Sequence, residues 1–146
     1  MSPTTTLRLK RTYDAPAERV FDAWTSPEVM RRWFHGMPDW ETPEAKVDLR
    51  VGGRIRVVMR DPEDGASYGG GGHYTLIERP NRLAFTWVWD REPHESHIEI
   101  EFEESDGTTT VSFTHSGLLN EADVRSHEVG WNNCLDSLEQ ALAEGV

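Results

Sequence analysis

The chain has 146 residues and a mass of 16.7 kDa, the usual size of one compact domain, so we expect a single domain over residues 1–146. Its 36% hydrophobic and 28% charged residues make it too polar for a membrane protein, and 10% aromatic residues are too many for a disordered chain. The net charge of −11 repels phosphate backbones and anionic lipids, so we expect no nucleic-acid partner and no membrane partner.

The charge is distributed unevenly along the chain. Residues 1–60 carry 11 Lys and Arg against 8 Asp and Glu, whereas residues 61–146 carry 4 against 18. The single cysteine, Cys134, excludes an internal disulfide, and residues 1–13 contain no apolar signal core. These features predict a cytoplasmic protein whose acidic residues lie on the outer faces of its later elements.

The first part of the chain predicts a strand and two short helices. Apolar and polar residues alternate over 4–13, which is typical of a half-buried strand, although Arg11 interrupts the apolar face. Apolar residues at three- and four-residue spacing then predict a helix that begins after Pro16. Ser26, followed by a proline, is typical of the cap of a second short helix. Residues 35–45 show no periodicity and are predicted to be a long loop.

A series of alternating segments follows, and each has a polar opposite face, which predicts an antiparallel meander with one solvated face. The segments are 47–51, 55–59, 74–78, 83–89, 98–102 and 111–115. Turn-forming residues separate them, and the run Gly69–Gly72 is expected to form a mobile hairpin end. The four glycines lack the ending of a phosphate-binding loop and lead into a strand, so we do not interpret them as one.

The last element is predicted to be a long helix from about Asn120, a suitable N-cap, to about Ala143. Its apolar stripe must cover the apolar face of the sheet, because nothing else in the chain is long enough to do so. Gly130 interrupts this helix, which indicates a close approach to the sheet or to a ligand. The predicted fold class is α+β: a curved antiparallel sheet of about six or seven strands around a C-terminal helix.

Several segments of this chain resemble one family. They are residues 15–34, residues 48–59, residues 74–89 with the turn Pro80-Asn81, and the late pair Gly130-Trp131. They are similar to the START-like superfamily, also known as SRPBCC or Bet v 1-like, and within it to the homologues of the activator of the heat-shock protein 90 ATPase. The resemblance implies a helix-grip fold, with a cavity between sheet and helix that binds apolar molecules in various relatives.

Ten residues are our candidates for the lining of such a cavity, because ligand pockets combine apolar and aromatic walls with a few polar groups. They are Trp33, Trp40, Met59, His73, Trp87, Trp89, Phe113, His115, His127 and Trp131. An ordinary packed core is the alternative interpretation of the same apolar residues. Trp40 lies in the predicted loop, where it would close the mouth of the cavity or pack on the surface.

Two histidines are candidates for chemistry as well as binding. His115 and His127 both fall on faces that point inward, where an imidazole can orient a ligand or move a proton near neutral pH. The alternative is a buried histidine that is hydrogen-bonded to its surroundings. His94 and His97 fall on opposite faces of a strand, so we predict no metal site, and no cofactor is expected. Cys134 is predicted to be a packed thiol.

Three functions follow as hypotheses. The first is the binding of a small apolar or aromatic molecule, by a monomer or a homodimer, with no reaction catalysed. The second, which rests on the family resemblance, is an interaction protein that stimulates a heat-shock protein 90 type ATPase. The third is an enzyme of the cyclase, dehydratase or hydrolase type that uses His115 or His127 as acid or base.

Overall fold

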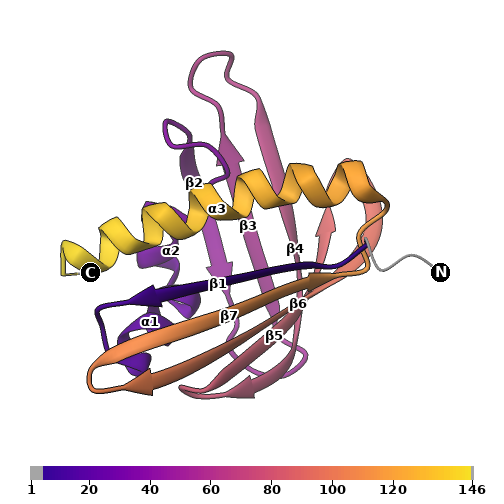
Figure 1. The fold of residues 1–146 in the computed structure, drawn as a ribbon. Helices are drawn as coiled ribbons and strands as arrows, with labels where there is room; N and C mark the ends of the chain where they lie inside the picture. Colours follow the sequence, from indigo (N-terminus) through magenta and orange to yellow (C-terminus); the bar gives the residue numbers. More distant parts are fainter. Residues whose placement is uncertain (1–4, 146) are drawn as a thin grey trace.

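The computed structural model describes residues 5–145, in which one seven-stranded sheet curls around a long helix (Figure 1). The elements are β1 (Leu7–Tyr13), α1 (Ala17–Thr25), α2 (Pro27–Trp33), β2 (Glu41–Val47), β3 (Arg54–Arg60), β4 (Ser67–Glu78), β5 (Arg82–Trp89), β6 (Glu92–Ser105), β7 (Thr108–Ser116) and α3 (Glu121–Ala143). The strand order is β1-β7-β6-β5-β4-β3-β2, and all neighbours are antiparallel. The predicted helix-grip fold is confirmed. Thr4, at the start of the predicted first strand, lies outside the described residues.

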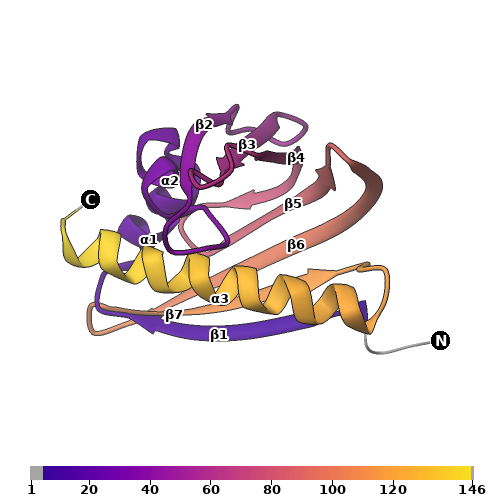
Figure 2. The same cartoon turned by 90° about the horizontal axis from the view of Figure 1, so that it is seen from above.

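Helix α3 lies across the apolar face of the sheet on the side of β1, and α1 and α2 pack beside its C-terminal half (Figure 2). Its start is the predicted one, because the Asn120 side chain accepts a hydrogen bond of 2.9 Å from the backbone N–H of Asp123. One stripe of the helix is buried: Trp131, Cys134, Leu135, Leu138, Ala141 and Leu142.

Polar contacts from β1 hold α3 in place. The guanidinium of Arg11 donates to Asp136 at 2.7 Å and to the side-chain oxygen of Asn132 at 2.9 Å. Two residues later, the hydroxyl of Tyr13 donates to the carbonyl of Leu135 at 3.1 Å. The arginine that interrupts the apolar pattern of this strand therefore serves as a tie between the sheet edge and the helix.

Aromatic rings fill the space between the helices and the sheet. Trp24 of α1 lies at their centre, with ring centroids 4.6 Å from Trp33, 6.0 Å from Trp131 and 6.1 Å from Phe113. Phe34, directly after α2, stacks on Trp87 of β5 at 5.7 Å. The two short helices thus close one end of the space under α3.

The segment between α2 and β3 differs from the prediction in two ways. The predicted loop 35–45 ends early, because β2 begins at Glu41 as an edge strand, a position that tolerates Pro43. The predicted strand 47–51 is wrong beyond its first residue, because the chain turns there and Val51 is 63% exposed. Alternation alone did not separate a strand from a turn with apolar residues.

The prediction of a hairpin end at the glycine run is also wrong, since Gly69–Gly72 lies inside β4 and pairs with both β3 and β5. A Cβ atom at Gly70 would lie 2.7 Å from the ring of Trp87. At Gly71 and Gly72 it would lie 2.2 Å and 2.1 Å from backbone oxygens of the neighbouring strands. The glycines therefore permit close packing within the sheet.

Gly130 marks a close approach, but to a loop. Its backbone faces Gly36 in the α2–β2 loop, where an added Cβ would lie 3.5 Å from the Cα of Gly130. Asn133 donates to the carbonyl of Gly36 at 2.8 Å, and the thiol of Cys134 donates to the carbonyl of His35 at 3.2 Å. The middle of α3 thus fastens this loop.

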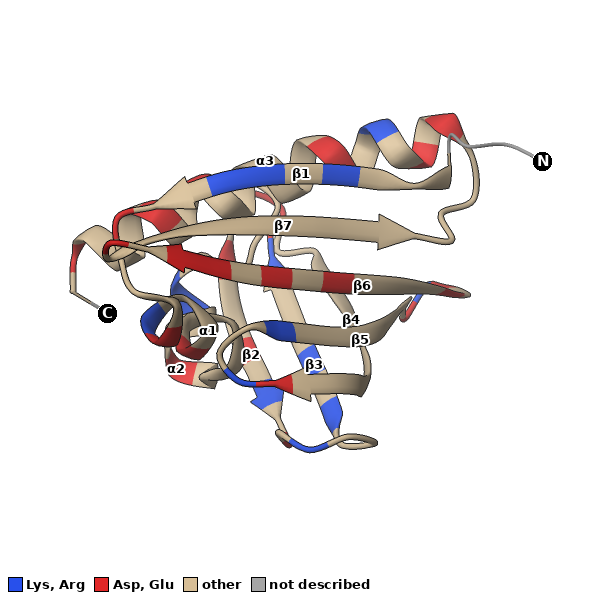
Figure 3. Ribbon diagram, turned by 60° about the horizontal axis from the view of Figure 1, so that its bottom comes forward, with Lys and Arg blue, Asp and Glu red and all other residues tan. Residues whose placement is uncertain are grey.

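The outer face of the sheet carries much of the charge. Figure 3 shows acidic residues in a row along β6 and basic residues along β1 and β3. Glu101 and Glu103 are exposed in β6, and Glu99 forms an ion pair with Arg82 of β5 at 3.4 Å. Exposed pairs of this kind contribute little to stability, so we interpret the row as a solvated face.

Two glycine substitutions should have opposite effects on stability. Gly70→Ala places a methyl group against the buried ring of Trp87, and we expect a loss of about 1 to 3 kcal/mol in the free energy of unfolding. Gly130→Ala meets its nearest atom at 3.9 Å, and the better helix former should add up to about 1 kcal/mol. Urea unfolding followed by circular dichroism measures both. A Gly70→Ala variant as stable as the unsubstituted protein would contradict the packing described here.

Candidate functional site

A pocket of about 670 Å³ lies between α3, the α2–β2 loop and the strands β3 to β6. Its volume is within the usual range for sites that bind small molecules. Aromatic and sulfur-containing side chains make most of its wall. The lining residues are Phe34, Gly36, Met37, Trp40, Met59, Tyr68, Gly69, Trp87, Trp89, Arg91, Glu92, Asp123, Ser126, His127, Val129, Gly130, Trp131 and Cys134.

The mouth of the pocket carries exposed apolar groups. Met37 of the loop is 41% exposed and Val129 of α3 is 59% exposed, although both line the pocket. Trp40 stacks on Tyr68 with ring centroids 4.9 Å apart and an interplanar angle of 6°. The guanidinium carbon of Arg91 lies 5.5 Å from the centroid of the same Tyr68 ring. The mouth is therefore a short stack of flat groups.

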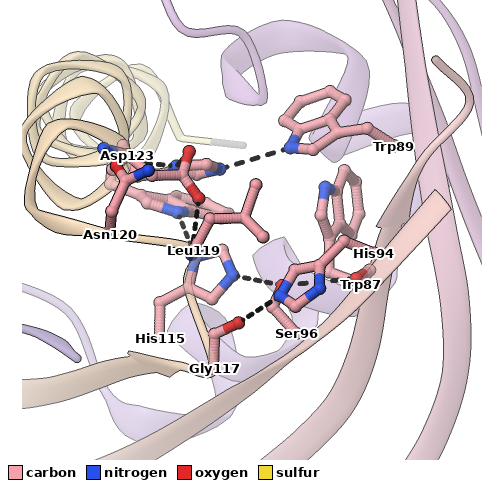
Figure 4. A network of polar contacts seen from close by, with 11 residues as sticks. Trp87, Trp89, His94, Ser96, His115, Gly117, Leu119, Asn120 and Asp123 are labelled. Carbon is pink, nitrogen blue, oxygen red and sulfur yellow. Dashed lines mark hydrogen bonds and ion pairs between the residues drawn. The ribbon is translucent and has the colours of Figure 1, made fainter. Parts of the chain in front are cut away.

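One hydrogen-bond network joins Trp131 and Trp87 of the pocket wall, and Figure 4 shows His115, Ser96 and Trp87 within it. The indole N–H of Trp131 donates to Nδ1 of His115 at 3.1 Å. Nε2 of His115 lies 2.7 Å from Oγ of Ser96, whose hydroxyl donates to the carbonyl of Trp87 at 3.2 Å. Strands β5, β6 and β7 and helix α3 are thereby joined through one imidazole.

This network requires a neutral His115. Because an indole N–H only donates, Nδ1 of His115 must accept, and the ring proton is on Nε2, which donates to Ser96. A second proton on Nδ1 would face the Trp131 donor. Burial, together with the nearby His127 and His97, lowers the pKa of His115 to about 3. His115 therefore does not exchange protons near neutral pH and serves the packing of Trp131.

His127 makes a second network of the same kind, and it lines the pocket. The indole N–H of Trp89 donates to Nε2 of His127 at 3.2 Å. The neutral ring then has its proton on Nδ1, which donates to the backbone carbonyl of Asp123 at 2.9 Å and lies 3.2 Å from its carboxylate. That carboxylate also accepts from the backbone N–H of Leu119 at 3.0 Å. Asp123 thus orients an imidazole that in turn orients Trp89.

Six of the ten candidate residues line the pocket: Trp40, Met59, Trp87, Trp89, His127 and Trp131. The other four lie elsewhere. Trp33 is fully buried and donates to the carbonyl of Ala23, while Phe113 packs on Trp131 in the core. His115 lies behind the wall, and His73 is exposed, with its ring 3.4 Å from the hydroxyl of Thr86.

Among the lining residues that sequence reasoning missed are Tyr68, Arg91 and Glu92 at the mouth and Asp123 beside His127. Tyr68 precedes the glycine run that was predicted to be a mobile hairpin end, Arg91 lies in the turn between β5 and β6, and Glu92 is the first residue of β6. Asp123 is four residues before His127 on α3, so helical spacing alone pointed to their contact. Turn residues give no periodic signal of this kind.

The structure offers no metal site within residues 5–145, because no three His, Cys, Asp or Glu side chains converge there. Cys134 is a packed thiol, and burial raises its pKa to about 12, so it is not a nucleophile near neutral pH. Among the helices in residues 5–145, none has both the length and the apolar character of a membrane span.

Known proteins resemble the chain along nearly all of its length. The family described as activator of Hsp90 ATPase homolog 1-like protein matches residues 14–143. A Nitrosomonas europaea protein of known crystal structure is 27% identical with a TM-score of 0.83, and the match covers 99% of this chain and 98% of that chain.

The short name of this family is AHSA1, and two further solved structures carry that name. The AHSA1 protein of Silicibacter pomeroyi is 27% identical with a TM-score of 0.83, over 97% of this chain and 99% of that chain. An AHSA1-like protein of Aeromonas hydrophila is 26% identical with a TM-score of 0.78, over 95% and 94%. No functionally curated protein shows significant similarity to the chain.

The neutral state of His115 should make the protein less stable in acid. The folded pKa of about 3 lies below the ordinary value of 6.5, so below pH 6.5 the unfolded chain binds a proton that the folded chain excludes. Stability is therefore lost as the pH falls. Between pH 7 and pH 5 this single group should account for about 2 kcal/mol of the free energy of unfolding.

The matched variant is His115→Gln, whose amide can accept from Trp131 and donate to Ser96 without titrating. Urea unfolding at pH 7 and pH 5 should give a smaller loss for the variant than for the unsubstituted protein. Burial also lowers the pKa of His35. Because both proteins contain His35, its contribution to the loss of stability cancels in the comparison. Equal losses would show that His115 is protonated in the folded protein.

Proposed function

The chain belongs to the activator of Hsp90 ATPase homolog 1-like family, and from this membership and the pocket we propose that it binds a small apolar or aromatic molecule between the sheet and α3. The observation that carries the proposal is an aromatic pocket of about 670 Å³ that reaches the surface beside exposed apolar groups. Apolar surface in such a pocket is released from water when a ligand enters.

The walls are organised before a ligand arrives, which favours binding. Trp131 and Trp89 each donate to a histidine that is itself hydrogen-bonded, so their rings are held in place. The ring of Trp87 packs between Phe34 and Trp89, at centroid distances of 5.7 Å and 5.3 Å. Side chains that are already fixed lose little conformational entropy on binding.

The same contacts favour binding over catalysis by the candidate histidines. His115 lies outside the pocket lining and is held neutral by its partners. His127 lines the pocket, but its accepting Nε2 is already occupied by the indole of Trp89. A general base must reach the proton that it abstracts, and this arrangement uses the free nitrogen to hold a wall.

The family's description supports a second candidate, the stimulation of a heat-shock protein 90 type ATPase. This function would use the outer surface of the fold and does not need the pocket. We expect a saturating amount of the protein to raise the turnover of a purified ATPase of this type, measured as phosphate release. Unchanged turnover would exclude this candidate and would leave ligand binding unaffected.

Ligand binding can be tested with N-phenyl-1-naphthylamine, a neutral aromatic probe whose fluorescence rises in apolar sites. We expect saturable binding of one probe per chain. Ser126→Phe, which places a ring at an exposed lining position of α3, should lower the affinity about tenfold, equivalent to about 1.4 kcal/mol.

The matched control is Gln140→Phe, which adds the same ring at an exposed position of α3 outside the lining. It should bind the probe as the unsubstituted protein does. Native mass spectrometry of gently purified protein would then identify a ligand carried from the cell. An absence of saturable probe binding, or equal effects of the two substitutions, would refute the proposed site.

A further inference from the structure

One buried donor in the pocket wall lacks a hydrogen-bond partner in the protein. Four buried polar atoms in the described part of the chain have no hydrogen-bond partner: Trp24 Nε1, Tyr74 Oη, Arg82 Nε and Trp87 Nε1. Of these residues, Trp87 alone lines the pocket, where its side chain is about 99% buried. A buried donor without an acceptor costs about 1 to 3 kcal/mol, so an acceptor atom brought by a ligand would be favourable there.

A second donor without an acid partner lies at the mouth. Within residues 5–145, Arg91 makes no ion pair, whereas its neighbour Asp90 is held by Arg56 at 2.8 Å. The guanidinium of Arg91 lies over the Tyr68 ring, beside the stacked Trp40. It is therefore a flat cation beside flat aromatic groups, in a position to meet an anion on a ligand that enters between them.

Two acidic residues line the pocket and would repel an anionic ligand. They differ in whether the protein supplies partners for their carboxylates. The carboxylate of Asp123 accepts from Leu119 and lies beside Nδ1 of His127, so its hydrogen-bonding capacity is partly used within the protein. Glu92 is exposed at the mouth and has no ion pair among the described residues. Glu92 should therefore lower the affinity for an anionic ligand, whereas Arg91 should raise it. Substitution of each residue separates the two effects.

We propose that the pocket selects an aromatic molecule that carries an acidic oxygen group, with the anion at Arg91 and a further acceptor oxygen toward Trp87. This inference rests on the proposed function, because it names the class of ligand for the same pocket. The aromatic body lies among the tryptophans, and the oxygen atoms meet donors that the protein leaves unpaired. Neutral hydrocarbons fill the same space without satisfying either donor.

Two probes with one skeleton test the anion. 1-Anilinonaphthalene-8-sulfonate is N-phenyl-1-naphthylamine with one added sulfonate. The ratio of the affinity for the sulfonate to that for the neutral probe should fall about two- to fivefold in Arg91→Gln, the range of an exposed ion pair. The ratio should rise in Glu92→Gln, and 0.5 M salt should reduce both effects.

The control is Arg8→Gln, which removes the same charge from an exposed position of β1, outside the pocket lining. If the ratio reflects only the net charge of −11, Arg8→Gln and Arg91→Gln will change it equally, and the inference is wrong. It is also wrong if the neutral probe binds and the sulfonate does not. Failure of both probes would instead remove the proposed function itself.

A second pair of probes tests the acceptor at Trp87. 2-Acetonaphthone and 2-ethylnaphthalene have similar shapes, but only the ketone has an acceptor oxygen. The indole N–H resonance of Trp87, assigned by its absence in Trp87→Phe, should move downfield with the ketone and much less with the hydrocarbon. Equal movement with both probes would mean that no hydrogen bond forms and would overturn this part of the inference.

Discussion

A single helix cannot cover a seven-stranded sheet, and the rest of this structure depends on that mismatch. A helix with its side chains is about 10 to 12 Å wide. Seven strands spaced by about 4.8 Å span about 29 Å. Helix α3 lies over β1 and is tied there by Arg11 and Tyr13, so the sheet must be covered by other means toward β3 and β4. Helices α1 and α2 close one end, and the pocket occupies the remaining space.

The tryptophans around this space need hydrogen-bond acceptors, and the histidines supply two of them. An indole N–H buried without a partner is unfavourable, and a neutral imidazole offers one nitrogen as an acceptor and one as a donor. His115 and His127 accept hydrogen bonds from Trp131 and Trp89, and their other ring nitrogens donate to a serine hydroxyl and a backbone carbonyl. The residues that first suggest acid–base chemistry thus explain how the aromatic wall is kept rigid.

Much of the fold could be predicted from the sequence, because it rests on periodicity and on caps. The stripe of α3 and the cap at Asn120 are local signals, and both are present in the structure. The glycine run misled prediction because glycine is typical of turns, whereas here Gly70 is needed for a contact with Trp87, which is 17 residues away. A requirement set by a distant ring leaves no trace in the local pattern.

The site was predictable to the extent that its residues lie in regular elements. Met59, Trp87, Trp89, His127 and Trp131 come from strands and α3, and their inward faces follow from alternation or helical spacing. His115 has the right face but does not line the pocket, whereas Trp131 does, and its Nδ1 accepts the hydrogen bond of the Trp131 indole.

Of the residues at the mouth, only Trp40 was predicted. Arg91 lies in a turn, which has no periodic pattern, and Tyr68 lies in β4 directly before glycines that are typical of a turn. The loop that carries Trp40 is held by backbone carbonyls of His35 and Gly36 that accept from side chains of α3 almost 100 residues later. In this loop, Trp40 stacks on Tyr68, over whose ring the guanidinium of Arg91 also lies. Trp40 and Arg91, which lie at the mouth and would contribute to ligand selectivity, are therefore positioned by tertiary contacts. The tryptophans that form the apolar wall are positioned by the strands and by α3.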